Sequence, residues 1–229
     1  KPVAARAARR CAVQNAALAD HTTIYGGNNT NSLDWAGKPA SDKILISQRL
    51  VSPEFISTSG MQLISGSDFK PVAASNGMNV LITESLEKLM GKGSAVGKIL
   101  LTPLADSVIH STVVGVVKDY VYGNIYGTPD PVVFYCIPEE ASFLYVRMNP
   151  GADKETGLLK IGEVMKQYNP AYPFTYRFVD DQFNAMFTNE ALMQQLSRLF
   201  AALAIIISCL GLFGLATYTA ERRTKEIGI

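Results

Sequence analysis

The clearest pattern in the sequence is an uncharged run of 22 residues near the end of the chain, from Leu199 to Ala220. As a helix, this run would rise about 1.5 Å per residue and cover roughly 33 Å, slightly more than the ~30 Å hydrocarbon core of a bilayer. A buried helix of a soluble protein is the alternative, but helices in globular proteins average only about 11 to 12 residues. The pattern therefore predicts a membrane-spanning helix.

Helical spacing begins well before this run. From about Gln182 the chain contains neither Pro nor Gly until Gly211, so we expect one helix from about Gln182 to Tyr218 that continues into the membrane. A helix of about 35 residues would be roughly 50 Å long and could carry a displacement from end to end. Asp181 would place a carboxylate at its N-terminus, where the helix dipole favours negative charge.

Strands and short helices alternate in the part of the chain before this helix. Strands are predicted for residues 43–49, 79–83, 111–118, 131–137, 142–148 and 174–179. Helices are predicted to begin at Ser52, Glu84 and Asp153, and to end at Gly60, Gly91 and Asn169. Gly115 interrupts a β-branched run and indicates a bulge or a close approach. In the strand 142–148, Phe143, Tyr145 and Arg147 share one face.

Composition limits the size of the protein and its partners. A chain of 229 residues with 48% hydrophobic residues can bury one substantial core or two smaller ones. The net charge of +1, from 21 basic and 20 acidic residues, gives no reason to expect nucleic acid as a partner. Of the three cysteines, Cys209 lies in the apolar run as a packing residue. Cys11 and Cys136 could be unpaired or joined in a disulfide.

Metal and cofactor motifs are absent from the sequence. The two histidines, His21 and His110, lie far apart and have no partners at metal-ligand spacing. The run from Gly91 to Ser94 matches neither the GxxxxGK[ST] nor the GxGxxG spacing of phosphate-binding loops. We therefore expect no cofactor or metal in this chain, and ATP-driven work would fall to another polypeptide.

Two acidic pairs, Asp180-Asp181 and Glu139-Glu140, are the weak candidates for acid/base catalysis. Adjacent side chains point to opposite faces of a strand and diverge by about 100° on a helix. Structural roles are favoured for all four carboxylates, and no GxSxG nucleophile motif appears. No residue is predicted to be catalytic.

Small residues mark one side of the predicted span. Ala204 and Ser208 form a small-xxx-small pair, and Gly211 and Gly214 follow. Such residues allow two helices to approach closely in a membrane. We therefore expect these four residues to pack against a second helix.

Charged residues follow the span at once, in the sequence Glu221-Arg222-Arg223-Thr224-Lys225-Glu226. Basic residues next to a span are typical of its cytoplasmic end. This orientation would place the C-terminus in the cytoplasm and the large preceding domain on the other side of the membrane.

The C-terminal sequence from Cys209 to Ile229 (CLGLFGLATYTAERRTKEIGI) closely resembles the second membrane helix and coupling segment of ABC transporter permeases of the FtsX-like, MacB-like family. Shorter stretches of the chain resemble markers of that family's extracytoplasmic core domain. They are Val51–Phe55, Gly60–Leu63, Ile82–Ser85, Val96–Lys98, Val114–Asp119, Tyr168–Phe174 and Phe178–Asp181. Ser67 departs from the pattern, because the family often carries Arg there.

The resemblance implies a mixed α/β (α+β) fold with two extracytoplasmic lobes. Residues 1–190 would form the core domain, with an α/β lobe from about 1–50 and 140–190 and a β-rich lobe inserted at about 51–139. Residues 191–220 would continue as the transmembrane helix. Residues 221–229, with Glu221, Arg222, Arg223, Lys225 and Glu226, would form a cytoplasmic coupling segment.

The resemblance also implies a function and partners. Members of this family sit in the bacterial inner membrane and transmit the motion of a cytoplasmic ABC ATPase, which binds the ATP, to their outer domain. The implied partners are that ATPase, a second permease copy or permease half, membrane lipid, and a periplasmic adaptor or cell-wall enzyme. Such a chain exports or extracts a substrate or activates an envelope partner, and it is not an enzyme.

Two other classes of function remain open from the sequence. One is a membrane-tethered ligand-binding or sensor domain that works without an ATPase, which a well-formed apolar pocket would favour. The other is a membrane-anchored hydrolase that uses Asp180, Asp181 or Glu139, which clustering of these carboxylates in one cleft would favour. Neither class accounts for the basic residues after the span.

Overall fold

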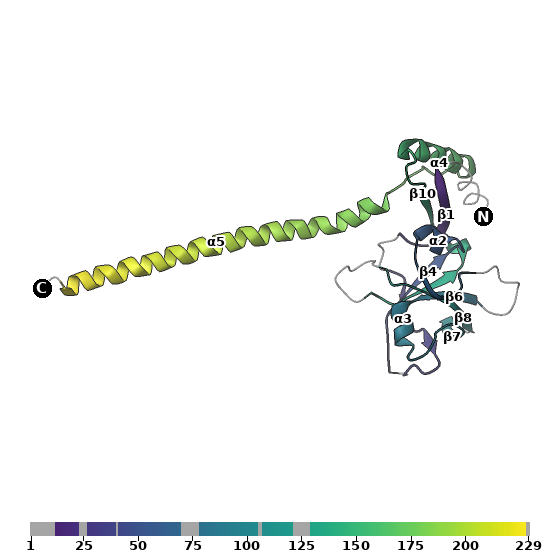
Figure 1. Cartoon of the computed structure of the whole chain (residues 1–229), viewed down its shortest axis with the longest axis horizontal. Helices are drawn as coiled ribbons and strands as arrows, with labels where there is room; N and C mark the ends of the chain where they lie inside the picture. Colours follow the sequence, from purple (N-terminus) through teal and green to yellow (C-terminus); the bar gives the residue numbers. More distant parts are fainter. Residues whose placement is uncertain are drawn as a thin grey trace. The chain divides into compact units, whose positions relative to one another are not determined.

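The computed structural model describes residues 12–22, 27–39, 41–69, 78–104, 107–120 and 129–227. The chain divides into two compact units, residues 1–175 and residues 176–229. The first unit holds a mixed sheet with short helices, and the second is a single long helix, α5 (Figure 1). The expected mixed α/β class is therefore confirmed, while the predicted lobe boundaries remain a prediction.

The described strands form one ten-stranded sheet with the order β10-β1-β4-β9-β6-β8-β7-β3, and β2 and β5 pair at the side with β4 and β8. The pairs β4–β9 and β6–β8 are parallel and the others are antiparallel. The strands are β1 (Val13–Ala19), β2 (Asn29–Thr30), β3 (Asp34–Trp35), β4 (Ile46–Val51), β5 (Leu63–Gly66), β6 (Met78–Thr83), β7 (Ile99–Leu104), β8 (Ser107–Val117), β9 (Val132–Cys136) and β10 (Phe143–Met148).

The helices of the first unit are short, apart from one. They are α2 (Phe55–Ser59), α3 (Glu84–Leu89), the 3-10 turn η1 (Pro138–Glu140) and α4 (Lys154–Tyr168). The Asp153 carboxylate caps α4 as predicted, because it accepts hydrogen bonds from the Thr156 hydroxyl and from the Thr156 amide at 3.0 Å. These bonds hold the pKa of the Asp153 carboxyl below its usual range.

The central strands are buried on both faces of the sheet. Val80 and Ile82 of β6 belong to one hydrophobic cluster, around Trp35 and Leu86, while Leu81 belongs to a second cluster on the opposite face. Burial on both sides explains why this strand reads as a continuous apolar run in the sequence. The predicted strand 79–83 is thereby confirmed, with one more residue at its start.

Gly115 lies where β8 forms a bulge. Val80 of β6 pairs with Val113, but Leu81 pairs with Gly115, so Val114 is the extra residue. The bulge reverses which face each later residue of β8 occupies. A Cβ at Gly115 would lie 2.6 Å from the Ser67 carbonyl oxygen, so the position admits no side chain. Both readings of Gly115 from the sequence, a bulge and a close approach, are confirmed.

Several elements differ from the prediction. The strand predicted at 111–118 is β8, which begins four residues earlier, and β1, β2, β3, β5 and β7 were not predicted. The strand predicted at 43–49 is β4, which begins and ends later because its parallel pairing with β9 begins at Ser47. The helix predicted from Ser52 begins at Phe55, because Ser52 is used by β1: its amide donates to the Leu18 carbonyl, and its hydroxyl accepts from the Leu18 amide. Gly60 ends this helix at a φ of 75°, as predicted.

The strand predicted at 174–179 is wrong. Residues 173–178 have no ladder partner, and Val179 is already the first residue of α5 (Val179–Ile227). The aromatic residues that produce the alternating pattern pack locally instead. The Phe174 ring lies against Gly162 of α4, and the Tyr176 and Phe178 rings meet edge to face with centroids 5.7 Å apart. The alternation here reflects aromatic packing and not a sheet.

Candidate functional site

Helix α5 holds every residue that the sequence singled out for membrane packing and for coupling. It runs without interruption over 49 residues, and the stretch from Met193 to Arg223 is long and apolar enough to cross a membrane. None of its most apolar window is buried within the chain, so large side chains such as Phe200, Ile207 and Leu212 face outward. A core helix of a soluble protein would bury such side chains, and a lipid environment would cover them.

Two threonines near the end of the span satisfy their hydroxyls within the helix. Thr217 Oγ1 donates to the Phe213 carbonyl at 3.1 Å, and Thr219 Oγ1 donates to the Leu215 carbonyl at 2.7 Å. Bonds of this kind remove the cost of placing a free hydroxyl in hydrocarbon. The polar residues of this segment are thus compatible with burial in lipid.

The four small residues lie along one side of α5. At about 100° per residue, Ala204, Ser208 and Gly211 fall within about 60° of one another, and Gly214 lies about a sixth of a turn further round. A Cβ at Gly211 or at Gly214 would meet no atom within 4 Å. This side of the helix has room for close contact with another helix, and that contact remains a prediction.

The charged segment continues the same helix. Glu221, Arg222 and Arg223 are exposed on α5, and the helical backbone extends to Ile227 through Lys225 and Glu226. Cationic groups in the last turns of a helix interact favourably with its dipole. The span and its basic end therefore form one continuous element.

The weak catalytic candidates occupy helix starts. Asp180 and Asp181 lie in the first turn of α5, as expected of carboxylates that favour the helix dipole, and Glu139 and Glu140 lie in η1. His21 pairs through Nδ1 with the neighbouring Asp20 carboxylate at 2.7 Å, and His110 lies on β8 opposite Leu101 of β7. Among the described residues, no three His, Cys, Asp or Glu side chains gather as metal ligands would. Cys11 lies outside the described residues, so its pairing with Cys136 is untested.

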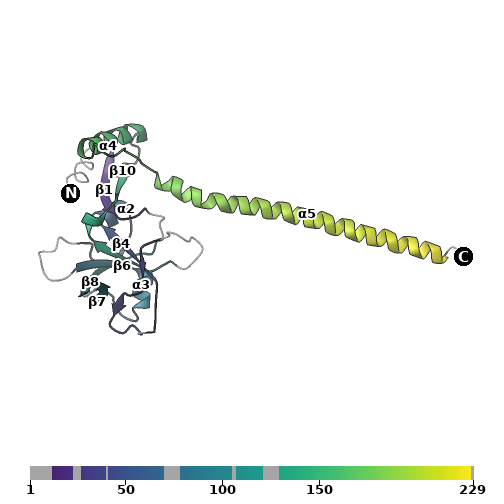
Figure 2. The same cartoon turned by 180° about the vertical axis from the view of Figure 1, so that it is seen from behind.

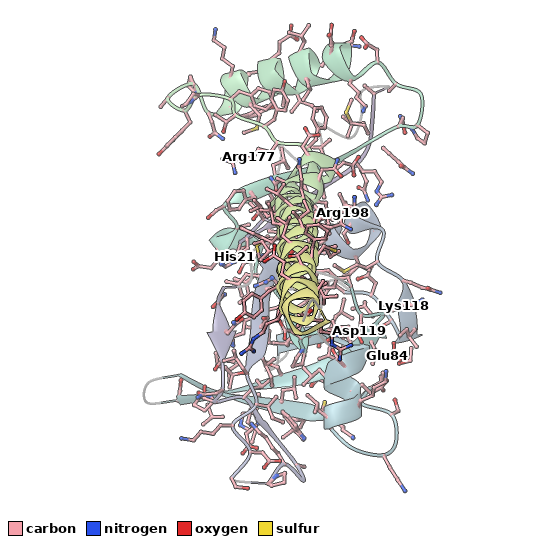
Figure 3. The ribbon with its side chains drawn as sticks, turned by 90° about the vertical axis from the view of Figure 1, so that its left-hand side faces the viewer. His21, Glu84, Lys118, Asp119, Arg177 and Arg198 are labelled. Carbon is pink, nitrogen blue, oxygen red and sulfur yellow. The ribbon has the colours of Figure 1, made fainter. Side chains whose placement is uncertain are left out.

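Two of the stretches that resemble the family's markers, Ile82–Ser85 and Val114–Asp119, meet at the start of α3. The N-cap residue of α3, Thr83, makes no capping bond of its own. The Asp119 carboxylate supplies one from beyond the end of β8, because it accepts from the Ser85 amide at 2.9 Å and from the Ser85 hydroxyl at 2.8 Å. Figure 3 shows Asp119 close to Glu84, which itself pairs with Lys88 at 2.7 Å. Thr83 Oγ1 instead accepts from the Val132 amide at 2.9 Å and so fixes the start of β9.

We expect Asp119→Ala to destabilise the first unit by about 1–2 kcal/mol, because it leaves the start of α3 without an acceptor. Asp119→Asn keeps an acceptor oxygen and should cost less than half as much. Thermal unfolding of the detergent-solubilised protein measures both effects. Equal destabilisation by the two variants would show that the charge of Asp119, and not capping, is what matters.

Two further stretches that resemble the family's markers, Val51–Phe55 and Gly60–Leu63, flank α2, which makes a contact that the sequence did not predict. Arg147 of β10 donates through Nε to the Thr58 carbonyl at 2.6 Å, near the C-terminal end of α2. Tyr145, two residues earlier, packs its ring edge to face on Phe55 with centroids 5.4 Å apart. The alternation of β10 predicted that Tyr145 and Arg147 share a face, but nothing in the sequence indicated that α2 lies against it.

Comparison with known proteins gives one distant sequence relative and several structures of similar fold. No protein-family model matches the chain. The macrolide export ATP-binding/permease protein MacB of Chromobacterium violaceum is 24% identical over 190 residues, which cover 78% of this chain and 29% of that protein. The chain thus spans less than a third of the length of this relative.

The periplasmic region of MacB from Actinobacillus actinomycetemcomitans superposes with a TM-score of 0.53 at 12% identity, and the match covers 82% of each chain. The extracellular domain of the noncanonic ABC-type transporter YknZ from Gram-positive bacteria superposes with a TM-score of 0.51 at 11% identity, over 75% of this chain and 84% of that one. These similarities establish the fold. Beside this fold, the chain carries one helix, α5, that is long and apolar enough to cross a membrane.

Proposed function

We propose, from the premise that the chain has the extracytoplasmic fold of MacB-like and FtsX-like ABC permeases, that it transmits ATPase-driven motion across the bacterial inner membrane. In this proposal residues 12–175 work outside the membrane, α5 crosses it, and a cytoplasmic ABC ATPase binds the segment after the span. The output is export or extraction of a substrate, or activation of an envelope partner. The chain itself makes and breaks no covalent bond.

The observation that carries the proposal is the continuity of α5. One helix of 49 residues measures about 74 Å at 1.5 Å per residue, more than twice the ~30 Å thickness of the hydrocarbon core. The first turn of α5 carries Asp180 and Asp181, and its cytoplasmic end carries Arg222 and Arg223, which the positive-inside tendency places in the cytosol. A continuous helix resists bending, so a force applied at one end displaces the other.

The small-residue side of α5 supports a second part of the proposal. Close packing of a second permease half, or of a second copy, against Ala204, Ser208, Gly211 and Gly214 would orient the helix in the membrane. Membrane lipid would cover the remaining large apolar side chains. A periplasmic adaptor or a cell-wall enzyme would be reached through the first unit.

The ATPase contact is tested by charge reversal. We expect Arg222→Glu/Arg223→Glu to reduce co-purification of the ATPase with the full-length permease at least tenfold, because an interface built on these charges would become repulsive. Lys166→Glu, an exposed position on α4, is the matched control and should leave co-purification unchanged. Labelling of a cysteine at Leu159 from outside intact cells checks that the orientation is retained, since basic residues also set topology.

Failure of the wild-type permease to bind an ATPase in native membranes would contradict the proposal. That outcome favours the tethered sensor or ligand-binding domain, which needs no ATPase. A normal ATPase complex with the doubly reversed variant would leave the coupling function in place but move its contact away from Arg222 and Arg223.

A further inference from the structure

Strands β1 and β10 with helix α4 form a layer at one end of the sheet, here called the β1–β10 layer. Figures 1 and 2 show this layer beyond β4, at the end of the unit from which the chain continues into α5. Helix α4 lies against this strand pair at Gly157, where a Cβ would collide with Met148 Cε, and its residues Ile161 and Val164 are buried. The Phe174 ring, just before α5 in the sequence, lies against Gly162 of α4. A displacement passed along the chain from α5 therefore enters the first unit at this layer.

The layer is joined to the rest of the sheet through few backbone bonds. β1 pairs with β10 along Val13–Ala19, whereas β1 and β4 share the single register pair Ala19↔Val51. Two further bonds flank this pair, from the Asp20 amide to the Leu50 carbonyl and from the Ser52 amide to the Leu18 carbonyl, both at 2.9 Å. These three residue pairs, Ala19–Val51, Asp20–Leu50 and Leu18–Ser52, are here called the joint. A connection this short keeps the two strands together but only weakly resists rotation of one strand relative to the other.

Helix α2 contacts the layer on the face opposite α4 and gives it a second attachment. Arg147 of β10 donates to the Thr58 carbonyl at 2.6 Å, and Asn15 Nδ2 of β1 donates to Ser57 Oγ at 2.8 Å. Helix α2 is itself packed into the core of the main sheet, because Phe55 and Ile56 are buried there with Phe134. The layer is thus held at the joint, at α2 and through Ala17, Ala19 and Tyr145, which pack in the hydrophobic cluster around Phe134.

Gly60 makes the Arg147 contact possible. Its φ of 75° lies in the left-handed region, where it ends α2, and a Cβ at this position would overlap the Arg147 guanidinium. The left-handed φ is what requires glycine here, and the absence of a side chain leaves room for the Arg147 guanidinium beside the end of the helix.

We infer that the contact of Arg147 with the end of α2 is a conformational device that fixes the angle between the β1–β10 layer and the main sheet. With the contact made, the layer and the main sheet move as one body; without it, the layer rotates over a wider range about the joint, limited by the remaining Asn15–Ser57 bond and the Phe55–Tyr145 ring contact. This inference rests on the proposed function, because it is the motion delivered through α5 that the contact would pass on. Arg147 is a positioning residue in this scheme and touches no substrate.

The test measures the distance between the layer and the main sheet in the full-length permease with its ATPase in lipid nanodiscs. Spin labels are placed on cysteines at Leu159 of α4 and Leu89 of α3, which are 71% and 45% exposed, in a cysteine-free background. We expect Arg147→Ala to widen the distance distribution without nucleotide at least twofold. Arg147→Lys keeps the charge but loses Nε and should give an intermediate width, and Lys166→Ala on α4 should leave the width unchanged.

A width for Arg147→Ala equal to that of wild type overturns the inference. If Arg147→Ala fails to fold, as judged by thermal unfolding, Arg147→Lys decides the question by the same criterion. The nucleotide-free width depends only on the contact, whereas an ATP-dependent shift of the same distance in wild type depends on the proposed function. Absence of the shift with a widened distribution in Arg147→Ala would reject the proposed function and keep the contact as a structural one.

Discussion

Insertion of seven Gly and Ser residues beside Glu190 in α5 should abolish coupling between ATP hydrolysis and the extracytoplasmic domain. Glu190 lies in the helix before the span. A Gly-Ser segment behaves as a flexible coil, so a displacement of the span would be absorbed by the insert. We expect ATPase activity and ATPase binding to persist, while the ATP-dependent shift between labels at Leu159 and Leu89 falls by at least tenfold.

The matched control is a seven-residue Ala-rich insert at the same place. Seven helical residues add about 10 Å and turn the helix by 700°, which returns it to within about 20° of its original direction. This insert should keep most of the shift, since Ala is the strongest helix former. Equal loss with both inserts would point to length and not stiffness as the requirement. A normal shift with the Gly-Ser insert would refute the role of α5 as a stiff element.

Phe134→Ala should cost about 3–5 kcal/mol of stability, the largest effect expected of a single substitution in the first unit. Phe134 is fully buried in β9, and its ring lies 6.1 Å from the rings of both Phe55 and Tyr120. The truncation leaves a cavity between α2, the centre of the sheet and the end of β8. Because domains are stable by only about 5–15 kcal/mol, much of the protein should be unfolded or degraded.

Phe134→Leu fills most of the same space and should lose less than half as much stability. Denaturant unfolding of the purified protein, followed by intrinsic fluorescence, measures the difference. A change below about 0.5 kcal/mol for Phe134→Ala would show that the surrounding side chains collapse into the space. Such a result would contradict the close packing on which the attachment of α2 depends.

Local patterns predicted four helices and five of the ten described strands (β4, β6, β8, β9 and β10), because burial and capping act over a few residues. The strand at 79–83, the helix capped by Asp153 and the bulge at Gly115 follow from apolar runs, cap residues and a glycine in a β-branched strand. Of the predictions that differed, the helix start at Ser52 involved a long-range partner, whereas the strand at 174–179 was wrong because its aromatic residues pack locally. The sequence predicts Ser52 as a helix N-cap. In the structure, its amide and its hydroxyl are both hydrogen-bonded to the backbone of Leu18 in β1.

The same difference between local patterns and long-range contacts applies to the candidate site. The positions of the small residues and of Arg222 and Arg223 on one continuous helix could be read directly, because a helix has a fixed period and rise. The roles of Asp119 and Arg147 could not be predicted from the sequence. Asp119 caps α3 through Ser85, which lies 34 positions earlier, and Arg147 bonds a carbonyl 89 positions away at Thr58. Such contacts are set by how the strands are ordered in the sheet.

The sequence by itself determined the apolar helix, its orientation signal, the mixed α/β class and the resemblance that led to the proposed function. These properties depend on hydrophobicity, charge and periodicity, which each short segment carries on its own. Only the tertiary structure decided that β1 and β10 form a layer joined to β4 at Ala19↔Val51 and held by α2. The physical reason is that a hydrogen bond between distant residues depends on the register of strands that neither segment specifies alone.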